Sequence, residues 1–459
     1  MFEPTSLSLL PSLLAIALAL YSKNVILSLF SGVVLGVLFL NDFAIIDSLN
    51  ALFILFSSLM QKPWILKTLI FVVLAGSVMA LIEKSGGVSG FVDFVLTRHS
   101  LVKSERSALM LSYILGIIIF IETSITALVS GAVGKPLCDK YKIPHEKLAF
   151  VCDSTSAPIG SLIVLNGYGA LLLGLITTQI SLGYIEQDAT QMLINSLKYN
   201  FYAMFALTVT FIFIYFGVNI GPMKNVSYKS QTRVQVNTDI KSMYLMLLPV
   251  SMMVILVFVF LYITGDGEIL KGSGSSSIFY TMLTTTLFTL LYYVGSKNMS
   301  FSTWGKTAYS GAKSFIPITF ILVFAFAMGN VTGELKTGIY LSTLASENVS
   351  VYFLAAIIFL LSSVISFSTG TSWGTFSIMI PIAVPMAVGM DANIALCLGA
   401  VISGGIFGDH CSPISDTTII SSMASDCELI SHVKTQLPYA LISGSLAFLM
   451  FIAFAVISD

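Results

Sequence analysis

One stretch decides the fold of this chain: Gly408-Asp409-His410-Cys411-Ser412-Pro413-Ile414-Ser415-Asp416-Thr417-Thr418. It combines carboxylates, an imidazole and hydroxyls, and long apolar runs lie on both sides, at residues 394–407 and 437–457. A carboxylate between such runs would lie inside a bilayer, where charge is costly and usually lines an ion or substrate path. The stretch therefore predicts a membrane-spanning protein with a functional site within the membrane.

The composition of the whole chain points the same way. Of its 459 residues, 56% are hydrophobic and 10% are charged, whereas soluble domains carry about 25% charged residues. Many runs approach the roughly 20 apolar residues that span a bilayer, and they are continuous, which favours helices over a barrel. We expect membrane helices at residues 7–21, 25–40, 65–82, 107–121, 124–134, 148–165, 168–184, 191–217, 243–264, 277–295, 314–331, 350–367, 373–388, 393–407 and 437–457, with 43–59 either spanning or interfacial.

Several function classes have no support in the sequence. The net charge of −1 gives no basic face for nucleic acid. The five cysteines show no CxxC spacing, so we expect small buried apolar side chains and neither a zinc site nor a disulfide framework. The chain has no Walker A loop, cofactor motif or recognisable nucleophile arrangement. We therefore expect no enzyme and no cofactor.

The polar stretch at residues 221–241 divides the chain into similar halves, residues 1–220 and 242–459. Its excess of Lys and Arg predicts a cytoplasmic loop. A shift of 248 residues places Thr123-Ser124 on Thr371-Ser372, and eight further residues place 152–156 on 408–412. We expect repeat cores at about 64–217 and 312–457.

Equivalent loops of the two halves differ in basic content, which predicts opposite orientations in the membrane. Inverted repeats with sites at broken helices are a common transporter plan. If every segment crossed the membrane, the number of crossings would not agree with the sides predicted for the loops. At least one segment is therefore expected to be interrupted or re-entrant. The expected fold is thus an all-α polytopic membrane protein with two inverted repeats and broken or re-entrant helices near the midplane.

Asp409 is the first candidate for a carboxylate that binds a cation or a proton, and Asp153 is its counterpart in the first half. Sodium takes oxygen ligands, and carbonyls freed at a helix break beside Pro413 would supply more of them. We expect Na⁺ at Asp409 and Asp153, with His410 modulating proton affinity. The alternative for both acids is helix capping.

Three further polar residues accompany these acids. On an unbroken helix Asp416 would share a face with Asp409, but Pro413 makes an N-cap of a following helix equally reasonable. Ser412 and Ser156 follow the two acids at the same spacing and are further cation-binding candidates.

Hydroxyl-rich clusters precede both acids. In the first half the cluster is Glu122-Thr123-Ser124, and in the second it includes Thr369, Thr371 and Ser372. These groups would coordinate sodium, or bind a substrate carboxylate at a helix N-terminus; back-bonding within a helix is the alternative. Asn166 would either unwind a helix and supply an amide ligand or sit in a plain turn.

Together these motifs resemble the NhaC family of sodium/proton antiporters. The resemblance rests on residues 408–418, with residues 153–158 and 368–374 similar to further polar motifs of that family. It implies a multi-pass transporter of the bacterial inner membrane, in the ion transporter superfamily, with inverted repeats, hairpins near the site and a homodimer as one oligomeric form. The element Asn166-Gly167-Tyr168-Gly169 departs from it, because the family has Gly-Trp-Gly there.

Two functions are compatible with these residues. The first is exchange of Na⁺ for H⁺, in which both ions compete for the intramembrane carboxylates. The second is sodium-coupled transport of a small organic acid or amino acid, which the hydroxyl- and glycine-rich clusters favour. The chain offers no intramembrane Arg as a carboxylate clamp, and this counts against the second.

Overall fold

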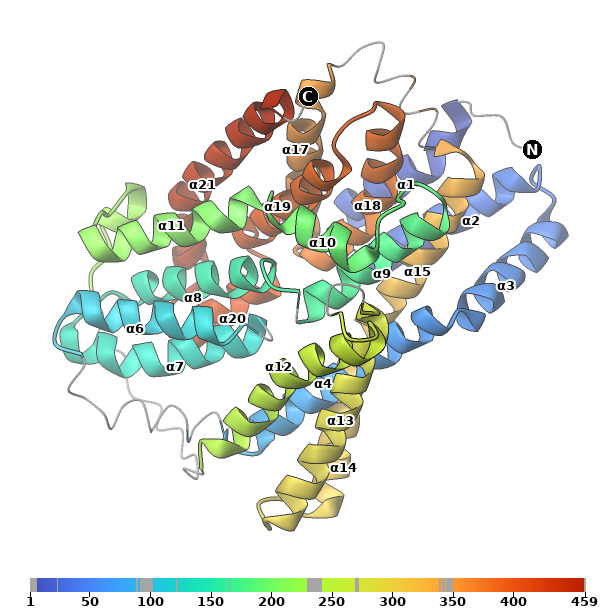
Figure 1. Ribbon diagram of the computed structural model, residues 1–459. Coiled ribbons are helices and arrows are strands. Elements are labelled where there is room, and N and C mark those ends of the chain that lie inside the picture. The colour runs from blue at the N-terminus through green and yellow to red at the C-terminus, as the bar shows by residue number, and fades with distance from the viewer. Residues whose placement is uncertain are drawn as a thin grey trace.

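The computed structural model describes residues 6–22, 24–87, 90, 102–120, 123–164, 166–228, 242–268, 272–337, 340, 343 and 350–457. Within these ranges the regular structure is entirely helical (Figure 1). The helices of the first half are η1 (Ser6–Leu9), α1 (Leu10–Ser22), α2 (Val25–Leu40), α3 (Ile45–Gln61), α4 (Pro63–Lys84), α6 (Glu105–Ile118), α7 (Thr123–Tyr141), α8 (His145–Gly160), α9 (Gly167–Ser181), α10 (Ala189–Leu197), α11 (Phe201–Phe216) and η3 (Gly221–Lys224). Those of the second half are α12 (Tyr244–Thr264), α13 (Gly274–Gly295), α14 (Phe301–Ser314), α15 (Ile316–Glu334), α17 (Val351–Thr369), α18 (Ser372–Gly389), α19 (Ile394–Cys411), α20 (Asp416–Ala424) and α21 (Leu429–Ile457).

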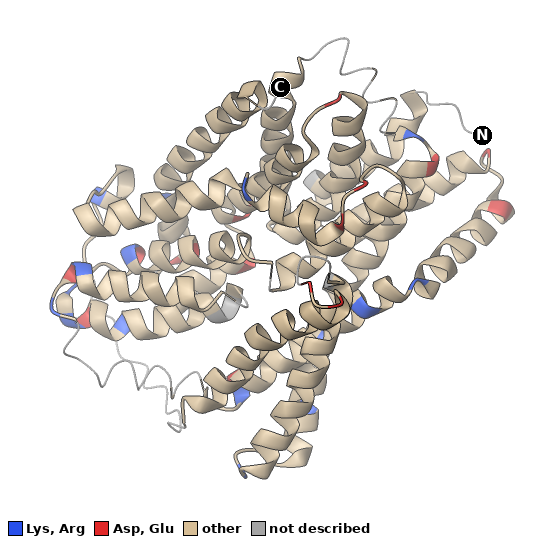
Figure 2. Ribbon diagram, in the orientation of Figure 1, with Lys and Arg blue, Asp and Glu red and all other residues tan. Residues whose placement is uncertain are grey.

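The structure confirms a polytopic membrane protein. In the described part of the chain, nine helical segments are long and apolar enough to cross a bilayer. Figure 2 shows few charged residues along the middle of the long helices, as an apolar surrounding requires.

Several expected boundaries are wrong: α7 continues to Tyr141 instead of ending at 134, α21 begins at Leu429 instead of at 437, and α14 forms where no helix was expected. The run 191–217 forms two helices, α10 and α11, because Asn200 at the break donates its amide to the carbonyl and hydroxyl of Ser161, at 3.2 and 2.8 Å. The run 393–407 continues as α19 to Cys411, so Asp409 lies in the last turn of that helix and the interruption falls beside Pro413, where the sequence predicts it.

Each half contains a helical hairpin followed by an interrupted helix, which confirms the predicted broken helices. The hairpins are α6–α7 and α17–α18, and the second turns at Gly370, whose φ of +66° favours glycine. The interruptions separate α8 from α9 and α19 from α20. Opposite membrane orientations of the halves, and the cytoplasmic side of 221–241, stay predictions; residues 229–241 lie outside the described residues.

The two halves interlock around these interruptions. Helix α7 of the first hairpin packs against α20, and α18 of the second hairpin packs against α9. Helix α21 contacts α8, α19 and α20. Residues that are more than two hundred positions apart therefore meet in the centre of the molecule.

Glycines allow α19 to lie directly on α17. A Cβ on Gly404 would be 2.3 Å from the carbonyl oxygen of Phe359, and one on Gly408 would be 2.2 Å from that of Ser363. The Ser366 hydroxyl donates to the carbonyl of Gly405 at 2.5 Å. Small residues thus bring these backbones together, as membrane helices commonly do.

Candidate functional site

Asp153, in the middle of α8, is fully buried and surrounded by donors from other helices. Its Oδ2 accepts from Thr418 Oγ1 at 3.2 Å, from Gln436 Nε2 at 2.9 Å and lies 3.3 Å from His432 Nε2. Its Oδ1 lies 3.5 Å from the Ser421 hydroxyl. Both oxygens of this carboxylate are therefore occupied by protein groups.

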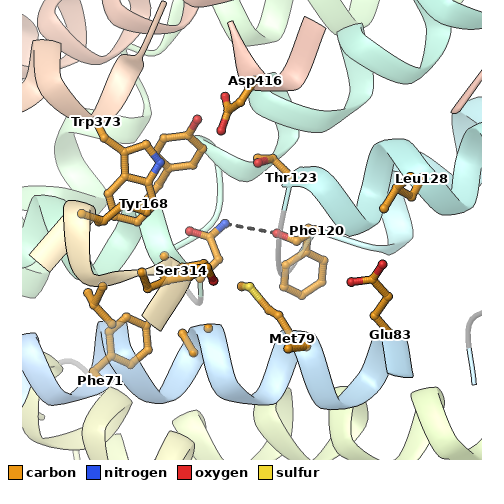
Figure 3. A pocket seen from close by; sticks show the side chains of 18 residues that line it. Phe71, Met79, Glu83, Phe120, Thr123, Leu128, Tyr168, Ser314, Trp373 and Asp416 are labelled. Carbon is orange, nitrogen blue, oxygen red and sulfur yellow. Dashed lines mark hydrogen bonds between the residues drawn. The ribbon is translucent and has the colours of Figure 1, made fainter. Parts of the chain in front are cut away.

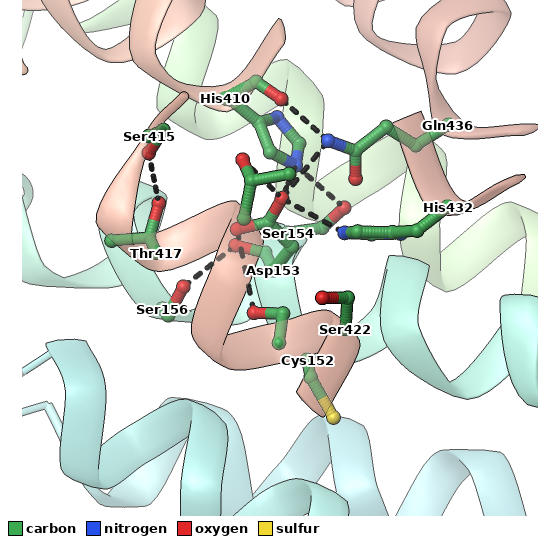
Figure 4. Close-up of polar contacts among 12 residues, drawn as sticks. Cys152, Asp153, Ser154, Ser156, His410, Ser415, Thr417, Ser422, His432 and Gln436 are labelled. Atoms are coloured by element: carbon green, nitrogen blue, oxygen red, sulfur yellow. Dashed lines mark hydrogen bonds and ion pairs between the residues drawn. The ribbon is translucent and has the colours of Figure 1, made fainter. Parts of the chain in front are cut away.

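His410 joins the same cluster from the last turn of α19 (Figure 4). Its Nε2 lies 3.3 Å from Ser154 Oγ and 3.8 Å from Asp153 Oδ2, and its Nδ1 lies 2.6 Å from the Tyr202 hydroxyl. The side chain of Gln436 also donates to the His410 carbonyl at 2.5 Å. The result is one buried polar network with two imidazoles around one carboxylate.

Asp409 lies beside His410 on α19 but belongs to a different chain of hydrogen bonds. It is buried, and its Oδ2 accepts from the Ser372 hydroxyl at 3.0 Å. The Ser372 hydroxyl in turn lies 2.8 Å from that of Tyr168. Among the described residues no hydrogen-bond donor reaches Asp409 Oδ1. One oxygen of this buried carboxylate is therefore available to a ligand.

The interruption between α19 and α20 carries several of the predicted residues. The Ser412 hydroxyl donates to the carbonyl of Phe367 at 2.7 Å and ties the interruption to the second hairpin. Asp416 is the first residue of α20, and its Oδ1 accepts from the Thr417 amide at 2.9 Å. The break places Asp416 and Asp409 on separate helices, so the shared face of an unbroken helix is not formed.

The first interruption is held by Asn166, the N-cap of α9. Its Nδ2 donates to the carbonyls of Gly160, at 2.6 Å, and Phe120, at 3.2 Å, and its Oδ1 accepts from the Gly169 amide at 3.1 Å. The side chain thus joins α8, α9 and the tip of the first hairpin.

Of the remaining hydroxyl candidates, some bond to carbonyls of their own helices and others lie at a helix start or in a cavity wall. Ser156 and Thr369 donate to carbonyls of their own helices, those of Asp153 and Ile365, as back-bonding predicts. Thr371 is the N-cap residue of α18 without a side-chain cap bond. Thr123 lines a cavity described below. Glu122 and the side chain of Ser124 lie outside the described residues.

Sequence reasoning missed several residues of these networks, among them Tyr168, Tyr202, Ser421, His432 and Gln436. Tyr202 lies in an apolar run, and Tyr168 lies in the element Asn166-Gly167-Tyr168-Gly169, where only Asn166 was a candidate. His432 and Gln436 are four residues apart near the start of α21, so they lie on one face of that helix. That spacing of two polar residues before an apolar run was the only signal in the sequence.

A cavity of about 330 Å³ lies beside the Asp409 site (Figure 3). Its walls come from α4, the α14–α15 junction, the hairpin tips and both interruptions. Tyr168 is shared: its ring lines the cavity and its hydroxyl contacts Ser372. Tyr168 therefore links the cavity to Ser372, the residue that donates a hydrogen bond to Asp409.

The donor set around these acids does not resemble a transition-metal site. No group of three His, Cys, Asp or Glu side chains able to hold a metal occurs in the ranges that the structure describes. Four cysteines are buried and Cys427 is half-buried. Carboxylate and hydroxyl oxygens are hard ligands that suit alkali or alkaline-earth cations.

Interrupted helices with buried carboxylates, between hairpins inside a bundle of membrane helices, define a secondary transporter. A model of the Na⁺/H⁺ antiporter family matches residues 166–456. The chain belongs to this family.

Known relatives and a solved structure resemble this chain. An uncharacterized protein of Haemophilus influenzae is 32% identical over 96% of this chain and 89% of its own length. A malate-2H⁺/Na⁺-lactate antiporter of Bacillus subtilis is 36% identical over 19% of this chain and 18% of its own. The solved structure of Neisseria gonorrhoeae MtrF, which belongs to a class of antimetabolite efflux pumps, matches 91% of this chain and 86% of its own. The TM-score is 0.61 and the identity is 13%, which shows a shared fold.

Proposed function

We propose that this transporter exchanges Na⁺ for H⁺ and that Asp409 is the carboxylate for which the two ions compete. The supporting observation is that only one oxygen of the Asp409 carboxylate is hydrogen-bonded. Oδ2 accepts from Ser372, and Oδ1 has no hydrogen-bond donor among the described residues. A buried carboxylate that lacks a counter-charge is strongly unfavourable. Binding either Na⁺ or H⁺ removes this cost, and because the same oxygen takes both, one ion must leave before the other binds.

The surroundings of Asp409 suit a hard cation. The interruption that begins at Ser412 ends the helical bonding of the last carbonyls of α19; that of Asp409 accepts from the Ser412 amide at 3.0 Å and that of His410 from the Gln436 side chain at 2.5 Å. Carbonyl and carboxylate oxygens are the ligands that such cations prefer. Ser372 would rotate its hydroxyl lone pairs toward the ion.

Asp153 has a different part in this proposal. Its two oxygens already face Thr418, Ser421, Gln436 and His432, so no coordination position is left without rearrangement. With two imidazoles beside it, the cluster is instead suited to hold and pass a proton. We therefore propose Na⁺ binding at Asp409 and a proton-handling role for the Asp153 network.

The alternative is sodium-coupled transport of a small organic acid or amino acid. The cavity of about 330 Å³ beside Asp409 favours it, because that volume is in the range of small-molecule sites and far exceeds one ion. The Bacillus subtilis relative, by its name, couples Na⁺ and H⁺ to lactate and malate.

A flux assay in proteoliposomes separates the two functions. The vesicles carry an internal pH dye and an imposed pH gradient, and Na⁺ is added without any organic solute. A sodium-dependent pH change in wild type that Asp409→Asn lacks would support direct exchange. Asp391→Asn is the matched control, because Asp391 lies in a loop where its φ of +55° suits asparagine equally well. Normal exchange by folded Asp409→Asn protein would refute the assignment.

If wild type shows no change, while remaining folded, the organic solute becomes the main hypothesis. In either case we propose that the chain performs no chemical conversion and needs no cofactor beyond the transported ions. Placement in a bacterial inner membrane and a homodimeric state also stay proposals from the family resemblance.

A further inference from the structure

The cavity beside Asp409 has a wall of unusual chemistry for a site that would take an acid. Five aromatic side chains line it: Phe71, Phe120, Tyr168, Phe315 and Trp373. Two carboxylates, Glu83 from α4 and Asp416 from α20, complete it (Figure 3). No Lys, Arg or His is among the described residues of its lining.

The aromatic part of the wall is held in place by the fold. The rings of Tyr168 and Trp373 lie 5.4 Å apart at an angle of 32°. Gly167 makes room for this pair, because a Cβ there would lie 2.9 Å from Cη2 of Trp373. The Asp416 carboxylate is fixed by its bond from the Thr417 amide and its side chain is exposed to the cavity.

We propose that this cavity binds an organic solute that carries a protonated amine. Aromatic faces attract organic cations, and the attraction grows when water is excluded. Carboxylates on two sides would accept charge-assisted hydrogen bonds from the ammonium group. A solute with only carboxylate charge would meet two like charges and no cationic partner, which is unfavourable.

The inference deepens the proposed function and rests on it for the coupling to ions. The ring of Tyr168 lines the cavity, and the Tyr168 hydroxyl lies 2.8 Å from the Ser372 hydroxyl. Ser372 in turn donates to Asp409 at 3.0 Å. A solute against the Tyr168 ring would therefore change the position of the hydroxyl that binds the Asp409 carboxylate. Binding of amine and Na⁺ would be energetically coupled through these three side chains.

The test is a binding measurement on the purified full-length chain in detergent. We would titrate 2-phenylethylamine and, as a matched acid of similar size, 3-phenylpropionate, using calorimetry. Glu83→Gln and Asp416→Asn each remove one cavity charge, and Glu186→Gln is the control, since Glu186 is exposed in a loop outside the lining. Thermal unfolding of each variant checks that it is folded.

We expect the amine to bind and the acid not to bind. Each cavity variant should weaken amine binding about tenfold, the lower end for loss of one hydrogen bond to a charged group, and Glu186→Gln should leave it unchanged. The inference is overturned if the acid binds as well as the amine, if neither binds, or if both cavity variants bind the amine like wild type. The sodium flux of wild type without solute is measured separately, so a failure of the proposed ion exchange is distinguished from a failure of this inference.

Discussion

Replacing Gln436 with Leu tests whether the Asp153 network stabilises the fold as its geometry implies. The Gln436 amide donates to Asp153 Oδ2 at 2.9 Å and to the His410 carbonyl at 2.5 Å. A bond to a charged group contributes about 1.5–3 kcal/mol and a neutral one about 0.5–1.5 kcal/mol. The sum predicts a loss of roughly 2–4.5 kcal/mol in the free energy of unfolding for Gln436→Leu.

The same substitution elsewhere provides the control. Gln191 lies on α10, half-buried, with one amide bond of 3.3 Å to Asn195. Gln191→Leu should therefore change stability by less than about 0.5 kcal/mol, as surface substitutions usually do. Both variants would be unfolded in mixed detergent micelles and followed by circular dichroism.

A double-mutant cycle separates the contact with Asp153 from general effects of packing. Because Asp153→Asn removes the charge that Gln436 faces, the two substitutions together should cost less than the sum of their separate effects. The coupling energy should be about 0.5–3 kcal/mol, the range for residues in one polar network. A coupling energy near zero would refute the view that Gln436 acts through the Asp153 carboxylate.

Three further predictions concern the cation site and its packing. Sodium at a hundredfold excess over its dissociation constant should raise the unfolding free energy of wild type by about 2.7 kcal/mol, and Asp409→Asn should lose this response in a thermal scan. Tyr168→Phe removes a hydroxyl 2.8 Å from that of Ser372 and should weaken sodium binding about threefold to tenfold in flux assays, corresponding to one neutral hydrogen bond. Tyr113→Phe should leave sodium binding unchanged. Equal sodium affinity in the two variants would argue against a role for the Tyr168 hydroxyl at the sodium site. Gly408→Ala should reduce folded yield, because its Cβ would lie 2.2 Å from the Ser363 carbonyl oxygen. Gly305→Ala, whose Cβ would meet nothing within 4 Å beyond its chain neighbours and its own helix backbone, should fold at least as well as wild type.

The sequence by itself determined the class of the fold and the approximate location of the site. Continuous apolar runs must be helices in a bilayer, because every backbone polar group there needs an internal partner. Pro413 and the polar stretch around it predicted an interruption, and the structure has one at that place, between α19 and α20. The 248-residue shift predicted similar halves, and in the structure each half contains a helical hairpin followed by an interrupted helix. All of these features depend on neighbouring residues, so a linear pattern contains them.

Only the tertiary structure decided which polar groups meet. Asp409 and Ser372 are 37 positions apart, and Asp153 and Gln436 are 283 positions apart. Nothing in local periodicity states that α21 lies against α8, or that the hairpin of one half packs on the interrupted helix of the other. The same packing leaves Asp409 with an available oxygen and satisfies Asp153, although the two acids look equivalent in the sequence. The chemistry of a buried carboxylate depends on the donors that distant helices supply, and the position of those helices is set by side-chain packing over the whole chain.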